Sequence, residues 1–267
     1  MKVITLASGS KGNCTFIETD KVKFLVDCGI TLAEVETKLT ILGVNPSQIY
    51  AILVTHEHSD HIKSVGAFAR KYGCFVFALD CEWQALDKKL GRLEDVQKVK
   101  FPLASFYLQD TTVCPFRLSH DACSCVGYSF YNQGNKISIA TDFGVPTKNV
   151  LENLKDSNLI ILEANHDENL LLNNPKYSAS LKNRILSSKG HISNKTCAYI
   201  IKIIFTSNLT QVILAHLSEE NNSPSLAYET IKAELEKYGL IEGKHLYIDV
   251  ASQHNMGHLF ELKNKND

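Results

Sequence analysis

The sequence predicts an α/β fold in a single domain. An N-terminal series of short apolar segments separated by polar turns is typical of a β meander, and a longer region follows in which strand and helix patterns alternate. The chain has 267 residues, of which 44% are hydrophobic and 21% charged. This composition is typical of a globular protein and excludes extensive disorder. A chain of this length can bury a large core, so the fold itself requires neither a disulfide nor a metal.

The predicted meander opens the chain. Its three strands are expected at residues 2–7, 14–19 and 22–27. The first two are joined by Ser8-Gly9-Ser10-Lys11-Gly12-Asn13, in which two glycines permit a tight turn. An antiparallel arrangement of the three strands follows from these short connections.

Strands and helices then alternate along the chain. Further strands are expected at 51–55, 75–78, 137–141, 159–163 and 212–215. Apolar residues recur at helical spacing from Ile62 to Tyr72, where Gly73 supplies a stop. Two later helices are expected at 194–205, with Ser193 or Asn194 as the cap, and at 225–238. We expect one domain over residues 1–262 and a disordered polar tail over 263–267.

Charge and cysteine content narrow the class of protein. Lys and Arg number 28 and Asp and Glu 29, so the net charge of -1 does not predict a surface coated with positive charge. The opening apolar run is too short for a secretory leader, and no stretch approaches the ~18 apolar residues of a membrane span. The eight cysteines therefore predict a reduced, cytoplasmic protein with small, mostly buried thiols; Cys123 and Cys125 lack the C-x-x-C spacing of zinc ribbons.

A histidine-rich loop carries the chemical signal. His56-Glu57-His58-Ser59-Asp60-His61 places four potential metal ligands within six residues, directly after the predicted strand 51–55. Loops at the carboxyl ends of strands are where α/β enzymes keep their sites. Alternation places His56 and His58 on one side, while Asp60 and His61 fall in the turn toward the next helix. Two adjacent metal ions are therefore geometrically feasible.

The His-x-His-x-Asp-His pattern resembles the signature of the metallo-β-lactamase fold, which implies an αββα four-layer sandwich with two mixed sheets flanked by helices. The resemblance implies three more ligands, each following a strand, and His120, Asp142 and His216 occur in the expected order. By the family pattern His56, His58 and His120 hold one ion, Asp60, His61 and His216 hold the other, and Asp142 bridges them. Two such ions share a water, lower its pKa and supply hydroxide at neutral pH. Zn²⁺ or Mn²⁺ suits these ligands, and Fe²⁺ fits as well.

Two further segments resemble loops of ribonuclease Z-type nucleases. Leu162-Glu163-Ala164-Asn165-His166-Asp167 is similar to their Glu-Ala-Thr loop, and Gly190-His191-Ile192-Ser193-Asn194 is similar to their His-Ser-Thr loop. The resemblance implies that His191 protonates the leaving oxygen, with Glu163 orienting it. Asp60, His191 and Glu163 are accordingly the expected catalytic residues. His166 either contacts metal or phosphate or merely belongs to a turn.

The number of residues between the predicted ligands distinguishes the branches of this superfamily. Only 21 residues lie between His120 and Asp142, too few for the tRNA-gripping arm of ribonuclease Z, and the 73 between Asp142 and His216 cannot contain a β-CASP domain. Together with the opening Ser8-to-Cys14 segment, the motifs closely resemble the bacterial YycJ/VicX/WalJ subfamily, in the ribonuclease Z-related branch. This resemblance implies a metal-dependent nuclease, with 5′ to 3′ exonuclease activity on DNA.

The 8–13 turn is not a P-loop. Ser10, Lys11 and Asn13 either hold a phosphate through this turn or belong to a plain hairpin. DNA is favoured over RNA as the substrate, and no membrane partner is expected. The near-neutral total charge does not exclude nucleic acid, because two divalent ions concentrate positive charge at the site.

Other activities stay open at this point. The alternatives are a phosphodiesterase acting on a small cyclic or nucleotide substrate, a tRNA-processing-like ribonuclease, a glyoxalase II-like thioesterase and a non-catalytic metal-binding scaffold. The Glu163 and His191 loops disfavour the thioesterase. The sequence determines neither metal identity nor oligomeric state.

Overall fold

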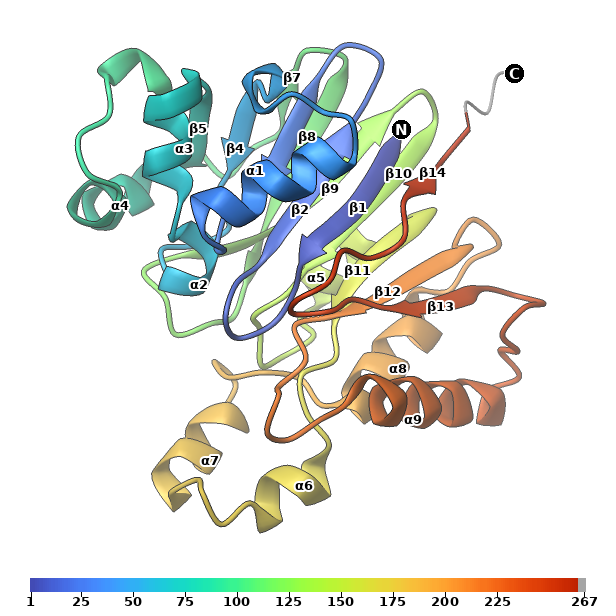
Figure 1. The fold of residues 1–267 in the computed structure, drawn as a ribbon. Coiled ribbons are helices and arrows are strands. Elements are labelled where there is room, and N and C mark those ends of the chain that lie inside the picture. Colours follow the sequence, from blue (N-terminus) through green and yellow to red (C-terminus); the bar gives the residue numbers. More distant parts are fainter. Residues whose placement is uncertain (264–267) are drawn as a thin grey trace.

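Two facing β-sheets with helices on their outer sides make up the protein in the computed structural model, which describes residues 1–263 (Figure 1). The first sheet has the order β14-β1-β2-β3-β4-β5-β6, with β1 Lys2–Ala7, β2 Cys14–Glu18, β3 Lys23–Val26, β4 Ala51–Leu53, β5 Phe75–Leu79, β6 Lys98–Phe101 and β14 Phe260–Glu261. The second has the order β13-β12-β11-β10-β9-β8-β7, with β7 Phe106–Leu108, β8 Thr111–Leu118, β9 Cys125–Asn132, β10 Asn135–Ala140, β11 Leu159–Glu163, β12 Gln211–Ala215 and β13 Tyr247–Val250.

Each half of the chain supplies its own helices. The first half carries α1 Leu32–Ile41, α2 Ser59–Ile62, α3 Val65–Tyr72 and α4 Trp83–Leu90, with 3₁₀ turns at Pro46–Gln48, Asp80–Glu82 and Asp95–Gln97. The second half carries α5 Lys148–Leu154, α6 Glu168–Asn173, α7 Ala179–Ile185, α8 Asn194–Ile204 and α9 Pro224–Lys237. Figure 1 places α1, α3 and α4 outside the first sheet and α8 and α9 outside the second.

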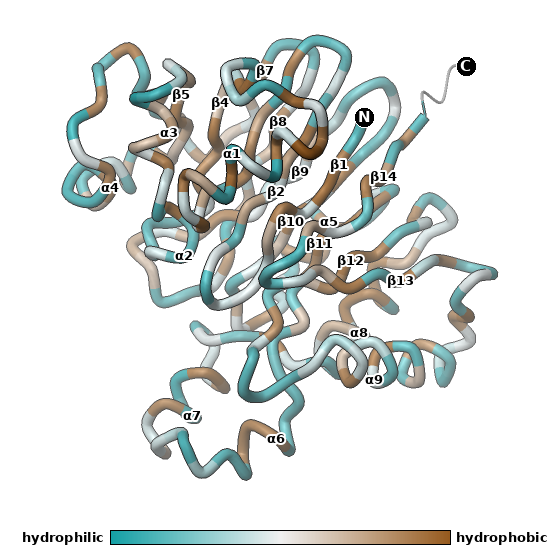
Figure 2. Tube along the Cα trace, viewed as in Figure 1, coloured by the Kyte–Doolittle hydropathy of each residue, from teal (hydrophilic) through white to brown (hydrophobic). Residues whose placement is uncertain are grey.

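Three separate apolar layers hold these elements together. One cluster lies between the first sheet and its helices and includes Leu39, Phe68 and Trp83. A second lies between the second sheet and its helices, and a third fills the space between the two sheets, with Phe24 and Phe130 in contact at 5.2 Å between ring centroids. Hydrophobic residues follow the strands while hydrophilic ones follow the connecting loops (Figure 2). A four-layer sandwich is the result, as the αββα prediction requires.

Strand direction brings the strand ends together. Strands β3 to β6 are mutually parallel, as are β10 to β13. Because β8 and β10 are both antiparallel to β9, their carboxyl ends point the same way. The loops after β8, β10, β11 and β12 therefore lie at one edge of the second sheet, where α/β proteins build their sites.

Most expected elements are confirmed, with one correction. The meander β1-β2-β3 is antiparallel throughout, and Ser193 caps α8 by accepting a hydrogen bond from the Thr196 amide. The helix expected around 62–72 is instead two helices, α2 and α3, interrupted at residues 63–64; Gly73, with a φ of 73°, ends α3 as predicted. The first ends early because the Ser64 amide donates to the carbonyl of Cys28 rather than continuing the helix.

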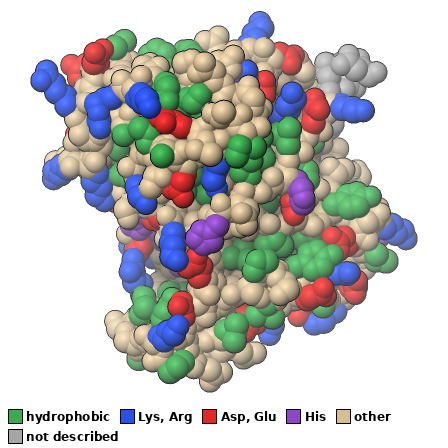
Figure 3. All heavy atoms as spheres, in the orientation of Figure 1, with side chains coloured by type: hydrophobic (Ala, Val, Ile, Leu, Met, Phe, Trp, Pro, Cys, Tyr) green, Lys and Arg blue, Asp and Glu red, His purple; other side chains and the backbone are tan. Residues whose placement is uncertain are grey.

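The helical hairpin formed by α6 and α7 (residues 168–185) projects from the body of the molecule. In Figure 3 it is a separate lobe below the body, with a notch between them. Only Leu171 and Asn174 are buried within it. The hairpin therefore lacks a core of its own and offers its side chains to the space beside the sheet edge.

The remaining expectations concern cysteines, membranes and the tail. All eight cysteines are free thiols, and Cys81 and Cys123 are exposed and Cys114 is partly so, which corrects the expectation of mostly buried thiols for these three. No helix within residues 1–263 is long and apolar enough to cross a membrane. The predicted tail 263–267 lies outside the described residues except for Lys263, whose carbonyl accepts a hydrogen bond from Asn135 at 2.8 Å.

Candidate metal centre

The histidine-rich loop follows β4 and leads into α2. His58 occupies the N-cap position of α2, so Asp60 and His61 fall in the first turn of this helix. The rings of His56 and His61 are fully buried and their centroids lie 4.1 Å apart. Glycine at position 29 is required beside this loop, since any Cβ there would lie 1.6 Å from the Asp60 carbonyl oxygen. The short strand and the immediate helix start therefore direct four polar side chains to one place.

The second sheet supplies three side chains from three separate strand ends. His120 follows β8, Asp142 follows β10 and His216 follows β12. Asp142 Oδ2 lies 3.2 Å from His61 Nε2, and its Oδ1 lies 3.5 Å from His216 Nδ1 and 3.8 Å from His120 Nε2. Asp142 thus stands between the side chains of the loop and those of the second sheet.

Left-handed backbone recurs at this edge. Asp27, Asp142 and His216 have φ values of 59°, 66° and 56°, and each directly follows a strand or lies within two residues of its end. Non-glycine residues rarely adopt this conformation, and Asp and His tolerate it better than most. These turns bend the chain at the strand end, where the three side chains contact the cluster, so their strain is part of how the site is built.

The seven predicted ligands, together with Glu163 and His191, form four overlapping sets, and within each set one nitrogen or oxygen atom per residue lies within 4.8 Å of the others. The sets are His56, His58 and His120; His56, His61 and Asp142; Asp60, His61 and His216; and Asp142, Glu163, His191 and His216. His56 Nε2, His216 Nε2 and Asp142 Oδ2 are buried without a hydrogen-bond partner. Buried polar atoms without partners are costly, and a metal ion would satisfy them. The imidazole and carboxylate donors present therefore fit a divalent metal ion.

Two buried carboxylates stand behind the cluster. Asp27 Oδ2 accepts a hydrogen bond from His61 Nδ1 at 2.7 Å, and the amide of Thr55 donates to Asp27 Oδ1 at 2.8 Å. Glu163 Oε1 accepts from His216 Nδ1 at 2.9 Å. In both pairs the carboxylate accepts the Nδ1–H hydrogen bond, so Nε2 is the nitrogen that faces the cluster. This arrangement fixes the tautomer and ring orientation of a metal-ligating histidine.

The electrostatics divide the histidines into two groups. Burial lowers the pKa of His56 and of His120, so both rings are neutral and ready to donate a lone pair. Burial alone would also lower the pKa of His216, but Asp142, Asp60 and Glu163 raise it to about 10. Burial and Asp27 oppose each other in the same way at His61, whose pKa is raised. The buried carboxylates thus stabilise positive charge beside them. Protons on His61 and His216 supply this charge here, and metal ions would supply it when they bind.

His191 lies beside the cluster, just before α8. Its Nδ1 donates to Glu163 Oε1 at 2.8 Å, and the amide of Ile192 donates to Glu163 Oε2 at 3.0 Å. Burial would lower the pKa of His191, but the Glu163 carboxylate more than offsets this and raises it. Burial would raise the pKa of Glu163, whereas His191 and His216 lower it to about 2. Each partner of the pair therefore favours the charged form of the other, the protonated imidazole and the ionised carboxylate.

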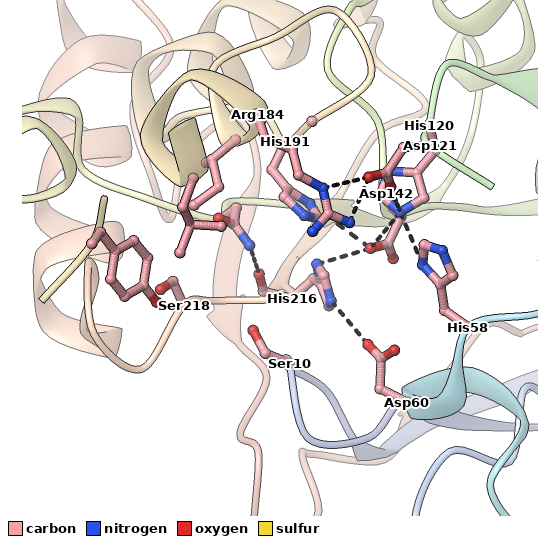
Figure 4. A pocket seen from close by; sticks show the side chains of 15 residues that line it. Ser10, His58, Asp60, His120, Asp121, Asp142, Arg184, His191, His216 and Ser218 are labelled. Carbon is pink, nitrogen blue, oxygen red and sulfur yellow. Dashed lines mark hydrogen bonds and ion pairs between the residues drawn. The ribbon is translucent and has the colours of Figure 1, made fainter. Parts of the chain in front are cut away.

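His191 also faces open space. Its side chain is 21% exposed and lines a pocket of about 350 Å³ together with His58, Asp60, His120, Asp142 and His216 (Figure 4). Figure 4 shows these side chains pointing toward one another around the same hollow. A substrate in this pocket would touch both the cluster and a proton donor.

The four remaining candidates lie in different places. Ser10 lines the pocket. Asn13 is buried, with its amide nitrogen 3.1 Å from His61 Nε2 and 3.4 Å from Asp60 Oδ2, so it contacts the cluster. Lys11 lies outside the pocket, its Nζ paired with Glu219 at 2.6 Å. His166 is 1% exposed and does not line the pocket.

Comparisons with known proteins agree on the family. The family model described as Metallo-beta-lactamase superfamily matches residues 7–79. The chain is 36% identical over 240 residues to exodeoxyribonuclease YycJ of Bacillus anthracis, covering 90% of each chain, and 36% identical over 237 residues to exodeoxyribonuclease WalJ of Streptococcus pneumoniae, covering 88% of each. The crystal structure of the metallo-beta-lactamase fold protein YhfI from Bacillus subtilis has a TM-score of 0.73 at 16% identity, covering 98% of this chain and 99% of that one.

Fold and clustered ligands together define a protein of the metallo-β-lactamase superfamily. Within it, the chain belongs to the YycJ/WalJ family. The predicted αββα fold and the predicted family are both confirmed.

Several residues of the site are not among those predicted from the sequence. Asp27 follows β3 and was placed only at the end of a predicted strand. Asp121, Tyr177 and Arg184 line the pocket. Their one sequence signal is position: Asp121 adjoins His120, and Tyr177 and Arg184 lie between the Glu163 and His191 segments.

Proposed function

We propose that the protein is a metal-dependent phosphodiesterase that degrades DNA in the 5′ to 3′ direction. The observation that carries the proposal is His191, which lines the same pocket as the metal-binding side chains and is joined at 2.8 Å to the buried Glu163 behind it. A metal-binding cluster alone suits many hydrolases. A positioned imidazolium beside it suits a reaction whose leaving oxygen needs a proton.

Two divalent ions fit this cluster. His56, His58 and His120 would hold one, Asp60, His61 and His216 the other, and Asp142 would contact both. Asp27, Asp60 and Asp142 provide three negative charges that offset most of the four positive charges of two such ions, while Glu163 balances the charge of His191. Zn²⁺ and Mn²⁺ suit the donor set, and Fe²⁺ also fits. When bound, such ions activate water and stabilise negative charge on phosphoryl oxygens.

His191 would act as the general acid. The alkoxide leaving group of a phosphodiester is a poor one, and a positioned donor accelerates its departure by about 10²–10⁴-fold. Glu163 keeps the His191 ring protonated and fixes its Nδ1, so the proton available to substrate is on Nε2. Glu163 is thus a positioning residue that serves His191 and His216 together.

DNA is the proposed substrate because the relatives that match 88–90% of this chain are named exodeoxyribonucleases. Eight free thiols are typical of a reducing compartment, so we place the activity in the cytoplasm.

Digestion of end-labelled nucleic acid tests the proposal. Single- and double-stranded DNA and RNA, labelled at the 5′ or the 3′ end, would be incubated with the protein loaded with Mn²⁺ or Zn²⁺. We expect a 5′ label to be released as a mononucleotide at once and a 3′ label to pass through progressively shorter products. Asp60→Ala and Asp142→Ala serve as controls for the metal-dependent reaction.

Other outcomes would replace the proposal. Release of the 3′ label first would reverse the polarity, and cleavage of RNA alone would assign a ribonuclease. Hydrolysis of S-lactoylglutathione without hydrolysis of any phosphodiester would assign a thioesterase.

A further inference from the structure

Helix α7 presents one face to the pocket. Tyr177, which precedes the helix, lines the pocket together with Leu181, Arg184 and Ile185. These positions are separated by four, three and one residues, the spacing that places side chains on one side of a helix. Ser178 fixes the start of the helix by accepting a hydrogen bond from the Leu181 amide. The hairpin thus adds a wall to the pocket that neither sheet supplies.

Arg184 is the one cationic Lys or Arg side chain among the pocket-lining residues of the described chain, 1–263. Its Nε lies 2.6 Å and one terminal nitrogen 2.5 Å from Asp121 Oδ2. The other oxygen of Asp121 lies 3.3 Å from His120 Nε2. Arg184 is therefore held one side chain away from the proposed metal ligands, as Figure 4 also shows.

The Arg184–Asp121 pair is open to exchange. The Arg184 side chain is 63% exposed and that of Asp121 27%, and exposed ion pairs contribute little to stability. A guanidinium binds phosphate with two parallel hydrogen bonds as readily as it binds a carboxylate. An incoming phosphate can therefore take the place of Asp121 without a large loss of folding free energy.

The same face offers an aromatic ring. Tyr177 is half-buried and lies just before α7, seven residues from Arg184, with Leu181 between them in the sequence. Aromatic side chains of this kind stack on nucleobases with little sequence preference. A phosphate-binding group and a stacking group on one wall together fit a single nucleotide.

We propose that the pocket face of α7 is a nucleotide subsite for the strand residue next to the scissile bond, with Arg184 binding its phosphate and Tyr177 stacking on its base. This inference rests on the proposed phosphodiesterase function. Arg184 holds the phosphate that is not cleaved, because the reacting phosphate is served by the metal ions and His191.

Kinetics with two substrates test the subsite. A single-stranded oligodeoxynucleotide contains the neighbouring nucleotide, whereas bis(p-nitrophenyl) phosphate does not. For Arg184→Gln we expect KM for the oligonucleotide to rise about 10–100-fold with kcat nearly unchanged, since a charged hydrogen bond is lost. Hydrolysis of bis(p-nitrophenyl) phosphate and metal content should stay within about twofold of wild type.

Matched variants control this result. Arg184→Lys should recover part of the lost affinity, and Tyr177→Ala should raise KM about tenfold while Tyr177→Phe does not. Lys189→Gln removes an exposed positive charge five residues after Arg184, on a side chain that does not line the pocket. Its KM should therefore match that of wild type. An equal rise for Lys189→Gln would mean that general charge, and not a subsite, attracts the strand.

Binding measurements separate this inference from the proposed function. Fluorescence anisotropy with a labelled oligodeoxynucleotide should show a salt slope about 0.7 smaller in Arg184→Gln, the value for one phosphate contact to a single strand. If the wild type binds the oligodeoxynucleotide without hydrolysing it, the proposed function is overturned. The change in Kd between wild type and Arg184→Gln would still test whether Arg184 binds a phosphate. An unchanged KM and Kd, or equal losses on both substrates, would overturn the subsite.

Discussion

The two sheets contribute to the candidate site in opposite ways. The first sheet supplies His56, His58, Asp60 and His61 from one loop after a single strand. The second sheet supplies one side chain from each of several strand ends, and these are as many as 96 residues apart in sequence, from His120 to His216. Each half also supplies one buried carboxylate, Asp27 or Glu163, behind a histidine.

The difference teaches where a site depends on local sequence and where it depends on topology. The loop of the first sheet carries its four side chains within six residues of sequence. The second sheet assembles its side chains only because β8, β10, β11 and β12 end at the same edge. The two halves meet at Asp142, which lies within 3.8 Å of His61, His120 and His216.

The largest expected effect comes from removing the Asp142 carboxylate, which the two halves share. Asp142→Ala should abolish binding of at least one ion and reduce phosphodiester hydrolysis by about 10³-fold or more, because activation of water by the ions is lost. Metal content by mass spectrometry and initial rates on labelled DNA measure the two effects. Full metal content with full activity would show that the two halves function without their shared carboxylate.

A smaller effect should follow from the carboxylate of the first half. Asp27→Asn removes the negative charge and one of the two acceptor oxygens that hold His61 and Thr55, and should weaken metal binding about 10–100-fold while the fold is retained. Competition with a chromophoric chelator gives the affinity. The matched control is Asp20→Asn at an exposed site, which should leave the metal affinity as it is in wild type.

Glu163, the buried carboxylate of the second half, should affect the pH dependence of kcat. Glu163 raises the pKa of His191, and an acid catalyst must be protonated, so kcat on DNA should fall as pH rises through that raised pKa. Glu163→Gln removes the cause of the rise. The alkaline limb of the kcat profile should therefore move to lower pH, with a loss of about tenfold at alkaline pH. A limb that stays in place would mean that another group donates the proton.

The smallest effect concerns stability and lies outside the site. Glu82 is fully buried with both carboxylate oxygens unpartnered, and burial raises its pKa from 4.5 to about 10. The fold favours the protonated form of Glu82. The stability that this form contributes is therefore complete below pH 4.5 and is lost as the pH rises toward 10. Glu82→Gln should increase the free energy of unfolding by about 1–3 kcal/mol at pH 8. Urea unfolding measures it, with the exposed Glu236→Gln as control.

The same contrast governs what could be predicted from the sequence. The loop 56–61 is visible by its density of ligands alone, whereas His120, Asp142 and His216 were identified only through the order of the family pattern. Asp27 was missed because one aspartate at a strand end carries no signal of its own. Its role depends on β3 lying beside β4, which is a property of the sheet.

Missed elements have local reasons. Strand β8 contains Pro115, which argues against a strand, but the pairing of β7 with β8 ends at Val113, so Pro115 lies where β7 no longer pairs with it. Helix α7 has seven residues, too few for a periodic pattern to stand out. Arg184 could therefore not be placed in the pocket before the structure was known.

A comparison of leaving groups tests the central claim, that the His191–Glu163 pair supplies the proton for phosphodiester cleavage at the metal-binding cluster. His191→Ala would be assayed on DNA, whose leaving alkoxide needs a proton, and on bis(p-nitrophenyl) phosphate, whose nitrophenolate does not. We predict a loss of about 10²–10⁴-fold in kcat on DNA and a loss of no more than about threefold on the nitrophenyl ester, with metal content unchanged. Equal losses on both substrates, or loss of the metal ions themselves, would contradict the assignment.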